Sequence, residues 1–130
     1  MTVLVGLLAL FLSASAVQAD QIVLACIGSI NYPANPPTKI DGDSAVVDFD
    51  SQTFKPPIFP AYKITKISNT NLSFGLDTSE TSVFGSIDRI SGNVSMTVMR
   101  PEERKKILSG GSAKMLSWMT AKCSPAKRMF

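Results

Sequence analysis

Leu72-Ser73-Phe74-Gly75-Leu76 is the stretch that decides the fold, because large apolar residues alternate strictly with small ones. A period of two places successive side chains on opposite faces of a β-strand, so the pattern predicts a strand with one buried face. Val94–Val98 repeats the pattern, with small polar residues between its apolar ones. Two such strands a short distance apart in the sequence indicate an antiparallel sheet.

Further segments with strand character lie on both sides of this pair. We expect strands within residues 21–27, 45–49, 62–67, 72–76, 82–89, 94–98 and 113–123. The first of these is apolar on both faces, which is typical of a strand that is covered on both sides. Asn31–Asp43 holds three prolines and is expected to be an exposed loop. Phe54–Pro60 also holds three prolines, so it should not form a central strand, and its apolar residues would cap one end of a core or form a contact surface.

One short helix is expected after Pro101, because proline suits the first helical turn and two glutamates follow it. Gly110 or Gly111 would end this helix, and its few apolar residues predict a surface position. The predicted fold class is therefore all-β: a small antiparallel barrel or sandwich of about seven strands, with one short surface helix. Closing a sheet into a barrel removes its exposed edges.

The two cysteines, Cys26 and Cys123, lie near opposite ends of the sequence. In an oxidising compartment, two cysteines in a small domain usually form a disulfide. We therefore predict a structural Cys26–Cys123 bond that holds the first and last strands together and closes the sheet. A reactive thiol is the alternative, but the chain has no histidine to act as its base.

Residues 1–19 carry no charge and include a nearly unbroken apolar run from Val3 to Leu12. Small residues follow, and Val17-Gln18-Ala19 matches the small-residue pattern that a signal peptidase cuts. We expect cleavage after Ala19, one β domain over residues 20–130, and a periplasmic or secreted location. A retained membrane anchor or a lipidated Cys26 are the alternatives. We do not expect the cleaved chain to span a membrane, because most strand segments are shorter than the roughly 9–11 residues that a spanning strand needs.

Charge is distributed unevenly along the sequence. Residues 100–130 hold eight basic and two acidic residues, a balance of +6, whereas residues 20–99 hold five basic and eight acidic ones, a balance of −3. This basic end is either a solvated surface or a binding surface for an acidic protein or an anionic envelope component. Its candidate residues are Arg104, Lys105, Lys106, Lys127 and Arg128. Nucleic acid is not expected as a partner, because no aromatic residues are interspersed among the basic ones and the chain is exported.

Three short patterns carry a family resemblance. They are Cys26-Ile27-Gly28, the Gly-x-Ile-Asp-Arg-x-x-Gly pattern of Gly85–Gly92, and the Lys-Cys-x-Pro-Ala pattern that begins at Lys122. In these places the chain resembles a family of small exported proteins of unknown function from rhizobium-like alphaproteobacteria. It departs from that pattern at Ala113–Ala121, where a tryptophan and two methionines interrupt the last strand. The resemblance implies export and a β fold, and it implies no activity.

The chemistry of known catalytic sites is mostly missing from the sequence. Without histidine there is no Ser-His-Asp or Cys-His catalysis, and two cysteines alone do not make a zinc site, so we expect no catalytic residues, metal or cofactor. Two pairs of aspartates, at positions 41 and 43 and at positions 48 and 50, would be the basis of a carboxylate-based hydrolase, the least favoured function. A solvated loop accounts for them better.

The hairpin motif Asp88, Arg89 and Gly92 contains the most informative polar pair. Neighbouring residues of a strand point to opposite faces, so one of the pair should point inward or bond the backbone of the turn near Gly92. A device that sets the register of the hairpin is the favoured interpretation, and a ligand-binding Arg89 is the alternative.

These observations favour a binding protein without catalytic activity. A periplasmic inhibitor or an envelope-associated interaction module is the alternative, and Ser109–Lys114 faintly resembles the inhibitory segments of small lysozyme inhibitors of this general build. An internal apolar cavity would indicate a small ligand. A filled core with a protruding loop would indicate a protein partner.

Overall fold

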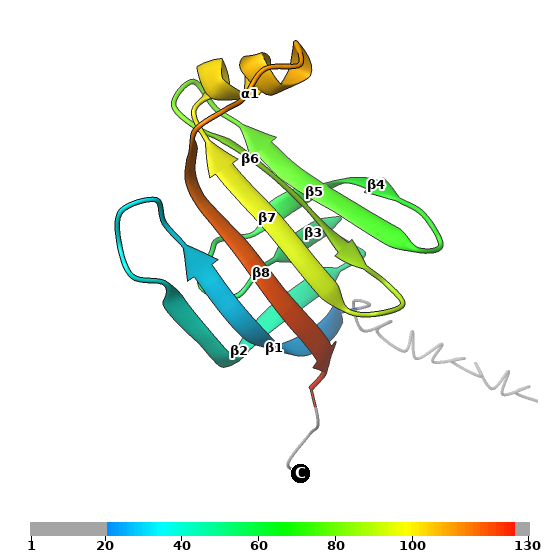
Figure 1. Ribbon diagram of the computed structural model, residues 1–130. Helices are drawn as coiled ribbons and strands as arrows, with labels where there is room; N and C mark the ends of the chain where they lie inside the picture. The colour runs from blue at the N-terminus through cyan, green and yellow to red at the C-terminus, as the bar shows by residue number, and fades with distance from the viewer. Residues whose placement is uncertain (1–20, 127–130) are drawn as a thin grey trace, which may run out of the picture.

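Eight strands follow one another around a closed barrel, and each runs antiparallel to both of its neighbours (Figure 1). The computed structural model describes residues 21–126. The elements are β1 (Gln21–Asn31), β2 (Thr38–Asp48), β3 (Thr53–Lys55), β4 (Tyr62–Ile67), β5 (Asn71–Asp77), β6 (Ser82–Asp88), β7 (Asn93–Met99), α1 (Pro101–Leu108) and β8 (Met115–Pro125). β8 pairs with β1 and so completes the barrel. The predicted all-β antiparallel fold with one short surface helix is confirmed, and of the two expected forms it is the barrel.

The number of strands is eight rather than about seven. The additional strand, β3, is only three residues long. It includes Phe54 and Lys55, which belong to the segment that was predicted not to form a central strand. β3 pairs with β2 on one side and β4 on the other, so that prediction was wrong for these two residues. β3 ends at Lys55 because the next residue, Pro56, has no backbone N–H to donate to a neighbouring strand.

Two further predictions about the first half of the chain were wrong. Asn31–Asp43 is not a loop, because β1 extends to Asn31 and β2 begins at Thr38, so only residues 32–37 connect the two strands. The start of β1 is not covered on both faces either, since Ile22 and Ile27 are exposed. β1 pairs with β2 over ten positions, so the backbone hydrogen bonds of the polar start of β2 are satisfied. The sequence of that segment alone did not predict a strand.

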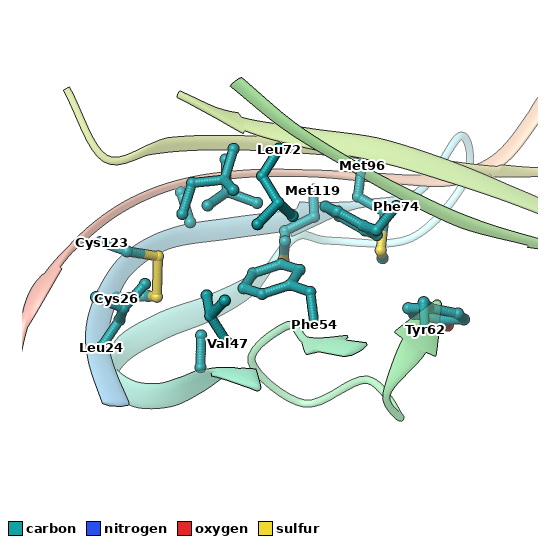
Figure 2. Packing of buried hydrophobic residues seen from close by; sticks show 14 of the residues in the cluster. Leu24, Cys26, Val47, Phe54, Tyr62, Leu72, Phe74, Met96, Met119 and Cys123 are labelled. Carbon is teal, nitrogen blue, oxygen red and sulfur yellow. A yellow bond between two sulfur atoms is a disulfide. The ribbon is translucent and has the colours of Figure 1, made fainter. Parts of the chain in front are cut away.

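The barrel interior is filled with large apolar side chains, which Figure 2 shows pointing toward one another. Phe54 and Phe74 lie at its centre with ring centroids 4.7 Å apart, and Met96 and Met119 are fully buried beside them. Alternation along β5 and β7 places Phe74 and Met96 inside, as the sequence predicts. Burying one side chain of this size contributes about 1.5–3 kcal/mol to folding.

α1 begins at Pro101 and has no buried residues, which agrees with the predicted surface helix. It ends in a Schellman motif, in which the Gly111 N–H donates to the Lys106 carbonyl at 2.7 Å and the Gly110 N–H to the Ile107 carbonyl at 3.0 Å. Gly110 has a φ of +87°, a conformation that suits glycine. The motif fixes the direction in which the chain leaves α1 toward β8.

Candidate functional site

The two ends of the barrel differ in what covers them (Figure 1). We call one the helix end, formed by α1 and the connections 32–37, 56–61, 78–81 and 109–114. We call the other the mouth, formed by the turns 49–52, 68–70 and 89–92 and by the outer ends of β1 and β8. The residues singled out in the sequence fall into two groups, one at each end.

The predicted disulfide is present and joins β1 to β8 on the side of the mouth (Figure 2). Cys26 and Cys123 are register partners with Cα atoms 4.1 Å apart, and both side chains are buried. The bond therefore crosses the seam at which the first and last strands close the barrel. A disulfide of this kind is typical of proteins in an oxidising compartment.

Asp88 and Gly92 build the turn between β6 and β7 at the mouth. The Asp88 Oδ1 atom accepts hydrogen bonds from the backbone N–H groups of Ile90, at 2.8 Å, and Ser91, at 3.0 Å. These bonds lower the pKa of the Asp88 carboxyl group below its ordinary value. Gly92 has a φ of +79°, and its carbonyl accepts the Cys123 N–H at 2.8 Å. The turn is thus bonded directly to β8 beside the disulfide.

Arg89 joins two turns of the mouth to each other. Its backbone N–H donates to the Thr70 carbonyl and its guanidinium Nη1 donates to the Ser68 carbonyl, both at 2.7 Å. The side chain therefore holds the β4–β5 turn against the β6–β7 turn. An arginine side chain has five N–H donors, so most of them are not used by this bond.

A depression of about 520 Å³ opens at the mouth and reaches the inward-facing ends of four strands. Leu24, Val47, Leu72 and Ile87 form its apolar walls. Its rim contains three charged residues, which are Asp88, Arg89 and Lys122. The hairpin motif predicted from the sequence therefore lies at the edge of an apolar well.

At the helix end, Arg104 is held against the barrel wall rather than projecting freely. Its Nη1 atom lies 2.7 Å from the Asp77 Oδ1 atom and 2.8 Å from the Ser82 hydroxyl oxygen, and its guanidinium lies 4.7 Å from the centre of the Phe84 ring. The buried Ser82 hydroxyl also donates to Asp77. This bond and then the charge of Arg104 lower the pKa of the Asp77 carboxyl group. Arg104 is an anchor of α1.

Glu103 ties α1 to the segment that follows it. One of its carboxylate oxygens accepts from the Lys106 ammonium at 2.9 Å, and the other accepts the backbone N–H of Lys114 at 3.0 Å. The bond from Lys114, followed by the one from Lys106, lowers the pKa of the Glu103 carboxyl group. Within residues 21–126, Lys105 is the one member of the predicted basic cluster on α1 without an ion pair. Lys127 and Arg128 lie outside the described residues, as does the predicted signal peptide.

A groove of about 700 Å³ lies between the segment that follows α1 and the β1–β2 connection. Pro33 is the residue of that connection that lines the groove. Met115, Leu116 and Trp118 supply apolar surface, and Arg100 and Lys114 supply positive charge. This site was not predicted from the sequence. Trp118 and the methionines were interpreted as irregularities of the last strand, although tryptophan is the residue type most enriched among those that dominate binding energy.

The aspartate pairs do not make a recognisable catalytic site. Asp41 pairs with Lys39 at 3.7 Å on the exposed surface, and its N–H donates to an Asp43 carboxylate oxygen at 3.0 Å. Hydrogen bonds from the Gln21 side chain and the Ser51 backbone lower the pKa of Asp48, whereas the general acid of a glycosidase needs a raised pKa. Within residues 21–126, no three His, Cys, Asp or Glu side chains gather in a group able to hold a metal ion. No helix in that range has the length and hydropathy needed to cross a membrane.

Comparisons of the chain with family models, with curated proteins and with solved structures found no match. The resemblance in the three short patterns therefore stays a prediction.

Proposed function

We propose that this chain is an exported, non-catalytic binding protein whose helix end contacts an acidic protein partner. The observation that carries the proposal is the groove in which exposed Met115 and Leu116 and half-buried Trp118 lie beside Arg100 and Lys114. Tryptophan, methionine and arginine are enriched at protein–protein interfaces relative to the rest of protein surfaces. Tryptophan and arginine are also the residues that most often dominate the binding energy.

Rigidity of the segment Ser109–Lys114 supports a docking role. The Schellman motif fixes its start, the Ser109 hydroxyl donates to the carbonyls of Lys105 and Lys106, and Glu103 holds the backbone of Lys114. A surface that is ordered before binding loses less conformational entropy when the complex forms. The segment can therefore present the groove wall in one conformation to its partner.

The charge around the groove favours an acidic partner. Glu103, the carboxylate in the groove, already accepts hydrogen bonds from Lys106 and Lys114, so a partner carboxylate would meet the remaining positive charge of Arg100 and Lys114. Lys105 adds a further cation on α1. Such complementarity increases association rates and makes binding sensitive to salt.

A filled barrel interior also favours a protein partner over a ligand enclosed in the core. Phe54, Phe74 and Met119 occupy the centre, and Pro56 and Pro57 are buried at the helix end. An inhibitor of an exported enzyme is a narrower form of the same function. The segment Ser109–Lys114, which is hydrogen-bonded to α1 at both ends and lines the groove with Ala113 and Lys114, is the observation that favours it.

The proposal is tested by selecting peptides from a phage-displayed random library against the purified protein. We expect the selected peptides to combine acidic with apolar residues and to bind more weakly at high salt. Lys114→Gln and Leu116→Ser should each weaken binding about tenfold or more, since both remove a contact in the groove.

Matched controls separate the groove from the general surface. Lys66→Gln removes an exposed lysine on β4, and Leu76→Ser removes a leucine that is 50% exposed, close to the 41% of Leu116. Both controls should bind like the parent protein. Selected peptides that bind the groove variants and the parent equally would contradict the proposal. Binding to phosphatidylglycerol vesicles with the same dependence on Lys114, and to no peptide, would replace the protein partner with a membrane surface.

A further inference from the structure

The mouth of the barrel is a second site, and it lies away from the proposed partner-binding groove. Its depression of about 520 Å³ has a size typical of small-ligand pockets, which commonly lie in the mouths of β-barrels. The walls are side chains that point inward from four strands, namely Leu24, Val47, Leu72 and Ile87. An apolar ligand group placed there would continue the barrel core.

Two apolar side chains at the rim of the mouth are exposed to solvent. Ile22 is 45% exposed and Ile90 is 80% exposed, and both line the depression. Isolated exposed apolar residues are common on proteins, but these two extend the apolar wall of a well. The opposite end of the barrel is different, because Pro56 and Pro57 are buried over it.

The charged residues at the rim indicate which sign of charge the exposed end of a ligand would carry. Arg89 and Lys122 both line the depression, and within residues 21–126 neither forms an ion pair with an acidic side chain. The third charged residue, Asp88, uses its Oδ1 atom to accept two backbone N–H groups of its own turn. The rim therefore carries two cations against one internally bonded carboxylate.

We propose that the mouth binds an anionic amphiphile with a single hydrocarbon chain, with the chain in the well and a carboxylate or phosphate head group at Arg89 and Lys122. Arginine suits this role because its planar group binds the oxygens of both head groups through paired hydrogen bonds. The bond from Arg89 to the Ser68 carbonyl positions the guanidinium before a ligand arrives. The filled core limits how deep the chain can reach, since Phe54 and Met119 are fully buried below.

The test is calorimetric titration of the protein, purified from the exported fraction of its host, with sodium octanoate, decanoate and dodecanoate below their micelle concentrations. We expect saturable binding of one chain, with affinity that rises about tenfold for each two added carbons until the well is full. Burial of apolar surface should give a negative heat-capacity change.

Ile22→Asp places a charge on the apolar wall and should abolish binding. Ile67→Asp is its control, because Ile67 is 46% exposed at the same end of the barrel but does not line the depression. Lys122→Glu should weaken dodecanoate binding about tenfold or more. Lys66→Glu, on β4, should leave it unchanged.

Further titrations distinguish the sources of the anionic group. Dodecyl phosphate should bind at least as tightly as dodecanoate, and inorganic phosphate alone should bind far more weakly, because it lacks the chain. The proposal is overturned if dodecyltrimethylammonium binds as well as dodecanoate, if Ile22→Asp binds normally, or if no fatty acid binds. It is also overturned if NMR of the ligand-free protein shows the Phe130 ring in contact with the Ile87 methyl groups, since the chain itself would then fill the mouth.

Discussion

The helix end and the mouth close the same barrel by different means. At the helix end the closure is non-covalent: Arg104 bonds α1 to Asp77 and Ser82, Glu103 accepts the backbone N–H of Lys114, and Pro56 and Pro57 are buried. At the mouth, the covalent Cys26–Cys123 bond fastens the seam and leaves an apolar depression beside it. The more open end of the barrel is thus the end at which the first and last strands are joined covalently.

Removal of the disulfide is the largest expected change and should affect the mouth first. The cysteines are 97 positions apart, and a cross-link over a loop of that length contributes roughly 4–5 kcal/mol to the free energy of unfolding. We expect the double variant Cys26→Ala and Cys123→Ala to lose about that much in urea unfolding. Hydrogen exchange should accelerate more in β1 and β8 than in α1 and its Arg104 contacts. A loss below about 1 kcal/mol would show that packing, and not the bond, holds the seam.

Gly92→Val should be the next most damaging change. A side chain at this position would place Cβ 2.0 Å from the Cys123 carbonyl oxygen, and φ is +79°, which a β-branched residue strongly disfavours. We expect a loss of about 3 kcal/mol or more in unfolding free energy, within the range of severe mutations. Ser91→Val, the neighbouring control, removes the 3.2 Å bond to the Asn93 N–H and should cost less than about 1 kcal/mol. Equal losses in the two variants would contradict the turn geometry.

Both large effects concern features that the sequence predicts. The disulfide follows from two isolated cysteines in a chain with an expected signal peptide, and the turn follows from Gly92 between two alternating segments. β3 could not be predicted, because three residues are too few to display a period and prolines follow them at once. The polar start of β2 gave no strand signal, since its structure depends on pairing with β1.

The two candidate sites were predicted less well than the fold. The sequence places Arg104 in a basic cluster, but its ion pair with Asp77 joins residues 27 positions apart, and no local pattern encodes such a contact. The groove at Trp118 likewise depends on the β1–β2 connection, which is distant in sequence. The mouth depression results from barrel closure as a whole.

At the helix end, Arg104→Met should cost about 1–2 kcal/mol, less than either change at the mouth. It removes a charge-assisted bond to the buried Ser82 hydroxyl and the contact with Phe84, whereas the pair with the exposed Asp77 contributes little by itself. Urea unfolding measures the loss. A loss of unfolding free energy equal to that of Gly92→Val would mean that the contacts at the two ends stabilise the barrel equally.

The same cluster gives a pH dependence with a definite sign. The pKa of Asp77 is lowered below its ordinary value of 3.8, first by the Ser82 hydroxyl and then by Arg104. A depressed pKa in the folded state stabilises the protein above the ordinary value, and this contribution is lost as the pH falls through the folded-state pKa. Asp77→Asn should therefore flatten the acid limb of the stability curve, and an unchanged limb would contradict the assignment.

The smallest predicted effect is a gain in stability at the helix end. Ile58 has a φ of +70° and is 56% exposed, so a β-branched side chain is held in a left-handed conformation with little burial in return. Ile58→Gly should stabilise the fold by up to about 1 kcal/mol, since glycine removes the steric cost of this conformation. Thermal unfolding measures the change. A clear loss of stability would show that the Ile58 side chain contributes packing that outweighs the backbone cost.

Whether the helix-end groove is the partner-binding site can be measured by chemical-shift mapping of a selected acidic peptide on ¹⁵N-labelled protein. The chain has one tryptophan, so its indole N–H gives a single resonance that reports on the groove. We predict that this resonance and the amides of Lys114 and Met115 shift on titration, while those of Asp88–Gly92 at the mouth do not. Shifts confined to the mouth, or to Ile58 and Phe59 in the β3–β4 connection, would contradict this assignment.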